Sequence, residues 1–112
     1  MQRGKDTEDQ AATYLAGRGL RLVERNWRCK GGEIDLIMRD GKVLVFVEVR
    51  SRSSARFGGA GASITSTKQG RLIHAARLYL SALGSPPACR FDAILFDGRE
   101  LTWLRDAFQA AD

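Results

Sequence analysis

Residues 31–52 read GGEIDLIMRDGKVLVFVEVRSR, and this stretch decides the fold. It contains two strand-like runs, residues 33–39 and 42–49, separated by Asp40-Gly41. An Asp-Gly pair between such runs is a strong hairpin signal, because both central positions of a tight hairpin turn require positive φ. The sequence therefore predicts an antiparallel hairpin whose two-residue turn is Asp40-Gly41.

The turn also predicts the register of this hairpin. Counting outward from it gives one wholly apolar face, on which the paired residues are Met38 with Val43, Leu36 with Val45, and Ile34 with Val47. A slip of one residue would move every apolar side chain to the other face. The residue pattern and the turn therefore favour the same pairing.

The opposite face is apolar near the turn and acidic at its open end. The predicted register places Glu33 directly opposite Glu48, with Cβ atoms roughly 5 Å apart, and Asp35 diagonal to Glu48. Two like charges at about 5 Å repel by about 3 kcal/mol at an effective dielectric of roughly 20. Three carboxylates at the centre of a sheet therefore require a bound cation, a retained proton or basic neighbours.

A divalent cation is one interpretation of this cluster. Magnesium and manganese prefer oxygen ligands, so carboxylates without histidine suit either ion. Such an ion can activate water and stabilise charge on a phosphoryl transition state. The other interpretation is a salt-bridge patch, because four basic residues are near in sequence, namely Arg28, Lys30, Arg50 and Arg52. The pattern alone leaves both open.

The rest of the chain supplies the layers around the hairpin. Apolar spacing and turn signals predict helices at 4–18 and 65–83 and strands at 20–27, 90–96 and 100–104. A linker at 28–32, a Gly-rich loop at 51–63 and a second hairpin turn at Asp97-Gly98 are expected between them. The order of helix, three strands, helix and two strands predicts an α/β fold, a sheet flanked by helices.

Glu8 is a carboxylate on the apolar side of the first predicted helix. It precedes Ala11, Ala12 and Leu15 by three, four and seven residues, so it shares their inward-facing side. A carboxylate on such a face is unusual. Two interpretations follow, a functional group turned toward the sheet or a side chain at the solvated rim.

The composition indicates one globular domain, residues 1–112, with a basic surface. A length of 112 residues suits a single domain. Lys and Arg together number 18 against 13 Asp and Glu, the net charge is +5, and 14 of the basic residues are Arg. The planar Arg fork binds two phosphate oxygens at once, so the balance favours a polyanionic partner, above all nucleic acid. The alternative is a soluble surface that is basic without such a partner, and charge alone does not separate the two.

Simpler features of the sequence bear on the cellular compartment and on zinc binding. The N-terminal residues are polar without the apolar core of a signal peptide, and no apolar run is long enough to span a bilayer. A cytoplasmic protein with no membrane partner is therefore expected. Cys29 and Cys89 form no CxxC pair and His74 is the single histidine, which argues against a Cys and His zinc site.

Several segments carry a resemblance to a known family. They are GGEIDLI at 31–37, FVEVRSR at 46–52, Asn26-Trp27-Arg28, Arg56-Phe57-Gly58, Lys68 and Arg90-Phe91-Asp92. Together they span nearly the whole chain, which resembles the YraN family of small bacterial proteins. That family in turn resembles the PD-(D/E)xK nuclease superfamily, and within it the archaeal Holliday-junction resolvases. The resemblance implies a restriction-endonuclease-like fold, a mixed central sheet with flanking helices.

The resemblance also implies roles for individual residues. Asp35 and Glu48 correspond to the catalytic metal-binding acids, while Glu33 and Glu8 are further candidate metal residues. Arg50 occupies the lysine position of the superfamily, and arginine can orient water or stabilise phosphate but cannot lose its proton. The residues expected to contact nucleic acid are Arg28, Lys30, Arg52, Arg56, Lys68 and Arg71.

These features favour an endonuclease that depends on Mg²⁺ or Mn²⁺ and acts on DNA, with branched DNA as a candidate substrate. A nucleic-acid-binding module with weak or no catalysis is the first alternative, and Arg50 favours it. A protein-interaction domain is the second, because an exposed strand at 100–104 could pair with a partner or with a second copy in a homodimer.

Overall fold

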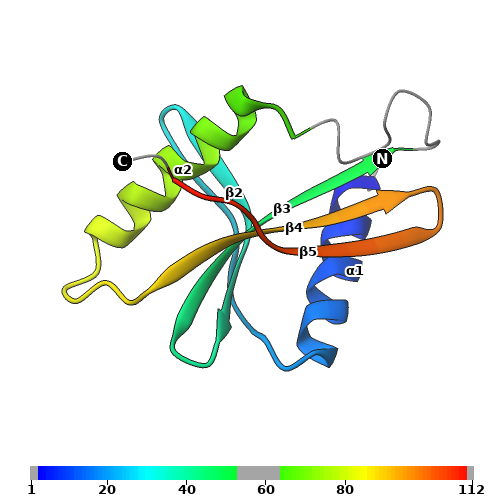
Figure 1. Ribbon diagram of the computed structural model, residues 1–112, viewed down its shortest axis with the longest axis horizontal. Coiled ribbons are helices and arrows are strands. Elements are labelled where there is room, and N and C mark those ends of the chain that lie inside the picture. Colours follow the sequence, from blue (N-terminus) through cyan, green and yellow to red (C-terminus); the bar gives the residue numbers. More distant parts are fainter. Residues whose placement is uncertain (1–2, 53–63, 111–112) are drawn as a thin grey trace.

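The computed structural model describes residues 3–52 and 64–110 (Figure 1). The elements follow the predicted order and are α1 (Arg3–Gly17), β1 (Arg21–Cys29), β2 (Gly32–Asp40), β3 (Val43–Arg52), α2 (Ser66–Ser81), β4 (Cys89–Asp97) and β5 (Glu100–Phe108). Within these residues, neither helix has the length and apolar character needed to cross a membrane.

The strands form one five-stranded sheet in the order β1-β2-β3-β4-β5. The pair β3 and β4 is parallel, and all other neighbouring pairs are antiparallel. A parallel pair needs a crossover connection, and α2 lies within the segment that joins these two strands. The mixed sheet with flanking helices that the resemblance implies, of the restriction-endonuclease-like type, is therefore confirmed.

The two helices cover opposite faces of the sheet (Figure 1). The α1 side chains Ala11 and Leu15 belong to a buried cluster with Leu36, Met38, Val45 and Val47. The α2 side chains Leu72, Ala75 and Ala76 belong to a second cluster with Ile37, Leu44, Phe46 and Phe91. The predicted division of the hairpin into two faces is thus confirmed, except that Ile34 packs in the α2 cluster.

The predicted register of the β2–β3 hairpin is wrong by two residues. The observed partners are Asp40 with Val43, Met38 with Val45 and Leu36 with Val47, so the turn is Gly41-Lys42. Gly41 takes φ +61° at the first central position, as in a type II′ turn. Asp40 remains in the strand, where its Oδ2 accepts a hydrogen bond from Nη1 of Arg90 at 2.9 Å. A shift of two residues leaves the paired side chains, from Leu36 to Val47, on their predicted faces.

Three other boundaries also differ from prediction. The second hairpin turns at Gly98-Arg99 instead of Asp97-Gly98, because Gly98 takes the positive φ of +65°. The expected linker at 28–32 is a two-residue turn at Lys30-Gly31, since Arg28 and Cys29 pair with β2. Strand β3 continues through residues 51 and 52 of the expected loop, and residues 53–63 lie outside the described residues.

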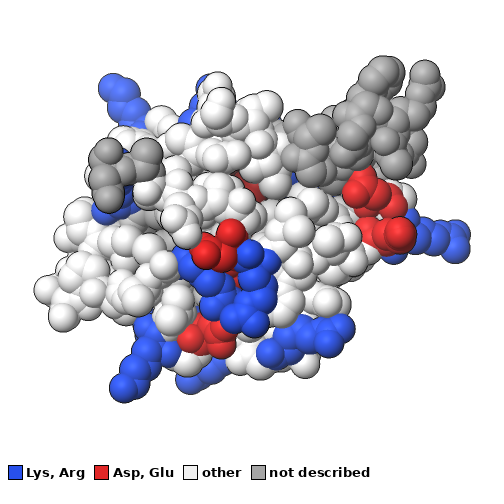
Figure 2. Space-filling view, viewed as in Figure 1, with Lys and Arg blue, Asp and Glu red and all other residues white. Residues whose placement is uncertain are grey.

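Strand β5 runs four residues past its predicted end at residue 104, to Phe108. A bulge near Asp106, which has φ +52°, lets it continue. The buried carboxylate of Asp92 stabilises this bulge, because it accepts hydrogen bonds from Asp106 N (2.9 Å), Trp103 Nε1 (2.9 Å) and Arg90 Nε (3.0 Å). On the surface, near the centre of the face that Figure 2 shows, Lys or Arg atoms lie beside Asp or Glu atoms.

Candidate active site

The candidate site lies where β2 and β3 separate. Their pairing ends at Leu36 and Val47, whereas β3 stays paired with β4 as far as Arg52. Asp35 is the first β2 residue beyond the paired region, and its Oδ2 accepts a hydrogen bond from the backbone N–H of Val49 at 2.8 Å. The Asp35 carboxylate is therefore fixed across the opening between the strands.

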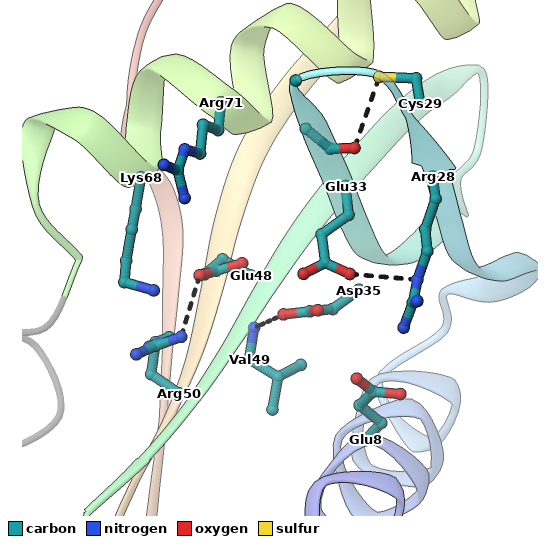
Figure 3. Close-up of a pocket in the computed structure, with 12 residues that line it drawn as sticks. Glu8, Arg28, Cys29, Glu33, Asp35, Glu48, Val49, Arg50, Lys68 and Arg71 are labelled. Carbon is teal, nitrogen blue, oxygen red and sulfur yellow. Dashed lines mark hydrogen bonds and ion pairs between the residues drawn. The ribbon is translucent and has the colours of Figure 1, made fainter.

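A cavity of about 620 Å³ opens at this point (Figure 3). Its walls come from α1, the end of β1, the β1–β2 turn, β2, β3 and the start of α2. The lining residues are Glu8, Arg28, Cys29, Gly31, Gly32, Glu33, Asp35, Glu48, Val49, Arg50, Lys68 and Arg71. Four carboxylates thus share one cavity with four basic side chains.

Asp35 and Glu48 form the acidic centre of the cavity. Glu48 keeps only 13% of its side chain exposed. Burial of Asp35, followed by the charge of Glu48, raises the pKa of Asp35 from 3.8 to about 7, although the Val49 N–H lowers it. Near neutral pH the pair therefore favours a retained proton or a nearby cation.

Glu8 reaches the same cavity from α1. Burial raises the pKa of Glu8, a hydrogen bond with Asn26 lowers it, and the charge of Asp35 raises it further. The side chain is partly buried, and Figure 3 shows it directed toward Asp35. The inward side of the helix that the sequence indicated is thus where Glu8 lies.

Glu33 lies at the rim and not opposite Glu48, which corrects the predicted pairing. Its Oε2 is 3.4 Å from Nε of Arg28, and 74% of the Arg28 side chain and 55% of the Glu33 side chain are exposed. The two-residue change in register is the reason, because the observed register, continued past its last pair of Leu36 and Val47, aligns Glu48 with Asp35 instead of Glu33. A solvent-exposed ion pair of this kind stabilises the fold little.

The basic side chains meet the acidic centre from two sides. Arg50 Nη1 lies 3.6 Å from Oε2 of Glu48. Lys68 and Arg71 reach in from α2, and Arg28 stands across the cavity from them (Figure 3). The structure therefore brings together four of the seven basic residues singled out from the sequence, counting Arg50.

Of the other three, the structure describes the side chain of Lys30 alone. Lys30 is exposed in the β1–β2 turn and does not line the cavity, and its carbonyl oxygen lies 3.1 Å from Nε2 of His74. Arg52 is the last residue of β3, and its side chain lies outside what the structure describes. Arg56 lies outside the described residues.

The start of α2 is held in place by two features. Thr65 caps the helix, because its Oγ1 accepts a hydrogen bond from the backbone N–H of Lys68 at 3.2 Å. Gly32 lies directly beneath the helix, where an added Cβ would be 2.3 Å from the carbonyl oxygen of Arg71. Sequence reasoning took Gly31-Gly32 only as linker residues, although a Gly pair before a strand can mark such a close approach of two backbones.

The donor atoms suit a hard divalent cation. Among residues 3–52 and 64–110, no three Asp, Glu, His or Cys side chains converge as a preformed metal site. Mg²⁺, however, is commonly held by one or two carboxylates, with water and substrate phosphate as the remaining ligands. The adjacent oxygens of Asp35 and Glu48 meet that requirement.

Comparison with known proteins gives a consistent family. The model of the uncharacterised protein family UPF0102 matches residues 7–96. The UPF0102 protein of Janthinobacterium sp. (strain Marseille) is 62% identical over 107 residues, which cover 96% of this chain and 87% of the relative. That of Dechloromonas aromatica (strain RCB) is 60% identical over 111 residues, covering 98% and 91%. The matched residues include every described side chain that lines the cavity.

Proposed function

The chain belongs to the uncharacterised protein family UPF0102, the YraN family that its motifs indicated, and from the geometry of its site we propose that it is a metal-dependent nuclease. The observation that carries this proposal is the Asp35–Glu48 pair, which lies in a cavity surrounded by basic side chains. The proposed substrate is DNA, including branched DNA, and the proposed cofactor is Mg²⁺ or Mn²⁺.

In this proposal Asp35 and Glu48 hold the cation. A bound divalent cation would polarise the scissile phosphate and lower the pKa of a bound water. The Val49 N–H fixes one oxygen of Asp35, so the other oxygen can face the cavity. Glu8 and Glu33 add negative charge around the pair without belonging to a preformed ligand set.

Arg50 acts as a fixed positive charge. Its guanidinium lies beside Glu48 at 3.6 Å and keeps its proton at any pH the protein experiences. Negative charge develops on the phosphate oxygens during hydrolysis, and a preorganised cation within the cavity stabilises it. Arg28 and Arg71, on opposite sides of the cavity, contact the neighbouring backbone phosphates.

A binding module without catalysis is the second candidate, because arginine replaces a residue that could exchange a proton. The carboxylates weigh against it. A surface evolved only to hold phosphates gains nothing from Asp35 and Glu48, which repel phosphate and also repel each other. In a metal-dependent hydrolase, by contrast, both carboxylates have a role, because they hold the cation.

Cleavage assays test the proposal. Labelled four-way junction, flap, duplex and single-stranded DNA, with single-stranded RNA for comparison, are incubated with Mg²⁺, Mn²⁺ or EDTA. We expect metal-dependent cutting that Asp35→Ala abolishes and that Asp6→Ala, at an exposed α1 position outside the cavity, retains. Binding that weakens steeply with salt but leads to no cutting would favour the binding module. Neither cutting nor binding would exclude both.

A further inference from the structure

We propose that Lys68 is the general acid of this reaction and donates the proton that the leaving oxygen needs. This inference rests on the proposed nuclease function and adds a catalytic residue to it. Phosphodiester hydrolysis expels an alkoxide, which is far more basic than an amine. A positioned proton donor typically accelerates such a step by about 10²–10⁴-fold.

Few described side chains in the cavity could supply that proton. The guanidinium groups of Arg28, Arg50 and Arg71 do not give up a proton. Asp35 and Glu48 are ionised when they hold a cation, and Glu33 is paired with Arg28 at the rim. The Cys29 thiol is directed at the carbonyl oxygen of Gly32, with Sγ 3.5 Å away. Lys68 and Glu8 remain. Lys68 is the better donor, because its ammonium always has three protons to offer, whereas the Glu8 carboxyl can donate only while it keeps its proton and is directed toward Asp35 (Figure 3).

The position of Lys68 is built into the fold. Its backbone N–H is fixed by the Thr65 cap, and the backbone N–H of Gln69 donates to the carbonyl oxygen of Thr65 at 2.9 Å. Figure 3 shows its side chain running from α2 along the Glu48–Arg50 pair, with the amine turned into the cavity. Among the described residues no hydrogen-bond or ion-pair partner is found for this amine, in contrast to Arg50.

The oxygen of a water molecule forms a bond to phosphorus while the bond from phosphorus to the leaving oxygen breaks. That electron pair stays on the leaving oxygen, which takes one proton from Nζ of Lys68. A proton of the attacking water passes to solvent, and a solvent proton restores the ammonium. The products are one phosphate monoester end and one hydroxyl end.

A substrate with sulfur in place of the leaving oxygen isolates this role, because a thiolate leaves without being protonated. The sulfur replaces the bridging oxygen that leaves in the wild-type reaction. The phosphate and hydroxyl ends of the wild-type products show which of the two bridging oxygens that is. We expect Lys68→Arg, which keeps the charge, to lower kcat on the oxygen substrate by about 10²–10⁴-fold with KM changed less than about threefold. On the sulfur substrate its kcat should return to within about tenfold of wild type.

Matched variants complete the design. Lys42→Arg makes the same change at an exposed turn residue outside the cavity and should leave both rates unchanged. DNA binding is also measured in EDTA at several salt concentrations. Lys68→Arg should bind duplex DNA with the wild-type salt dependence, whereas for Lys68→Gln the slope of log binding constant against log salt concentration should fall by about one phosphate contact. The midpoint temperature of thermal unfolding should be the same in both Lys68 variants as in the wild type.

Four outcomes overturn the proposal. If Lys68→Arg retains wild-type kcat on the oxygen substrate, Lys68 is not the acid, while Asp35-dependent cutting by the wild type preserves the nuclease. If oxygen and sulfur substrates lose rate equally, Lys68 only positions the phosphate. If Glu8→Gln, and not Lys68→Arg, is rescued by sulfur, the acid is Glu8. A wild-type protein that cuts nothing overturns the proposed function as well.

Discussion

Replacing Asp35 by Asn should stabilise the protein at neutral and alkaline pH. The carboxylate is buried beside Glu48, and its pKa is raised from 3.8 to about 7. The amide has no charge to bury, and its oxygen can still accept the hydrogen bond from the Val49 N–H, which is 2.8 Å in the wild type. The substitution therefore removes the repulsion and keeps the local contact.

The size of the effect follows from proton linkage. Between pH 3.8 and about 7 the folded state retains a proton that the unfolded state has lost, so the unfolding free energy falls as pH rises. At about 1.36 kcal/mol per pH unit, the wild type loses at most about 4 kcal/mol across this interval. We expect Asp35→Asn to match the wild type near pH 4 and to exceed it by about 2–4 kcal/mol at pH 8.

Urea unfolding in EDTA, followed by tryptophan fluorescence at several pH values from 4 to 8, measures this difference directly. Asp6→Asn, at an exposed residue of α1, controls for the loss of one negative charge. If Asp35→Asn is no more stable than the wild type at pH 8, or if its advantage does not grow with pH, the electrostatic account of the site is wrong.

Three further predictions follow from the same structure. Mg²⁺ at about ten times its Kd should raise the wild-type unfolding free energy by about 1.4 kcal/mol at pH 8, with little effect on Asp35→Asn, as measured in urea with and without EDTA. Gly32→Ala should destabilise the protein by about 1–3 kcal/mol in the same assay, because its Cβ would meet the Arg71 carbonyl oxygen, whereas Gly70→Ala, in open space within α2, should not. Asp92→Ala should cost about 3–5 kcal/mol, because Arg90 and Trp103 lose their buried acceptor; a thermal melt close to that of the wild type would contradict this.

Local sequence patterns were sufficient to predict the helices and strands and the side of each on which most of its side chains lie. Alternation along residues 33–49 assigns each side chain of the hairpin to a face because the strand period is two. That parity survives the two-residue error in register for the paired residues, although Ile34, beyond them, packs on the other face. Asp35 and Glu48 were correctly expected to lie together, and both line one cavity. The spacing of Glu8 relative to Leu15 likewise indicated the side of α1 that faces the sheet, because helical periodicity is also local.

What the sequence by itself determined is therefore the order of the elements, the two faces of the hairpin and the acidic residues on one of them. Only the tertiary structure decided the register, because Asp40 stays in its strand through Arg90, fifty positions along the chain. The tertiary structure also decided which basic side chains lie near the carboxylates, because the position of Lys68 depends on the packing of α2 over Gly32. The raised pKa of Asp35 has the same origin, since burial and the proximity of Glu48 exist only once the strands have paired and separated.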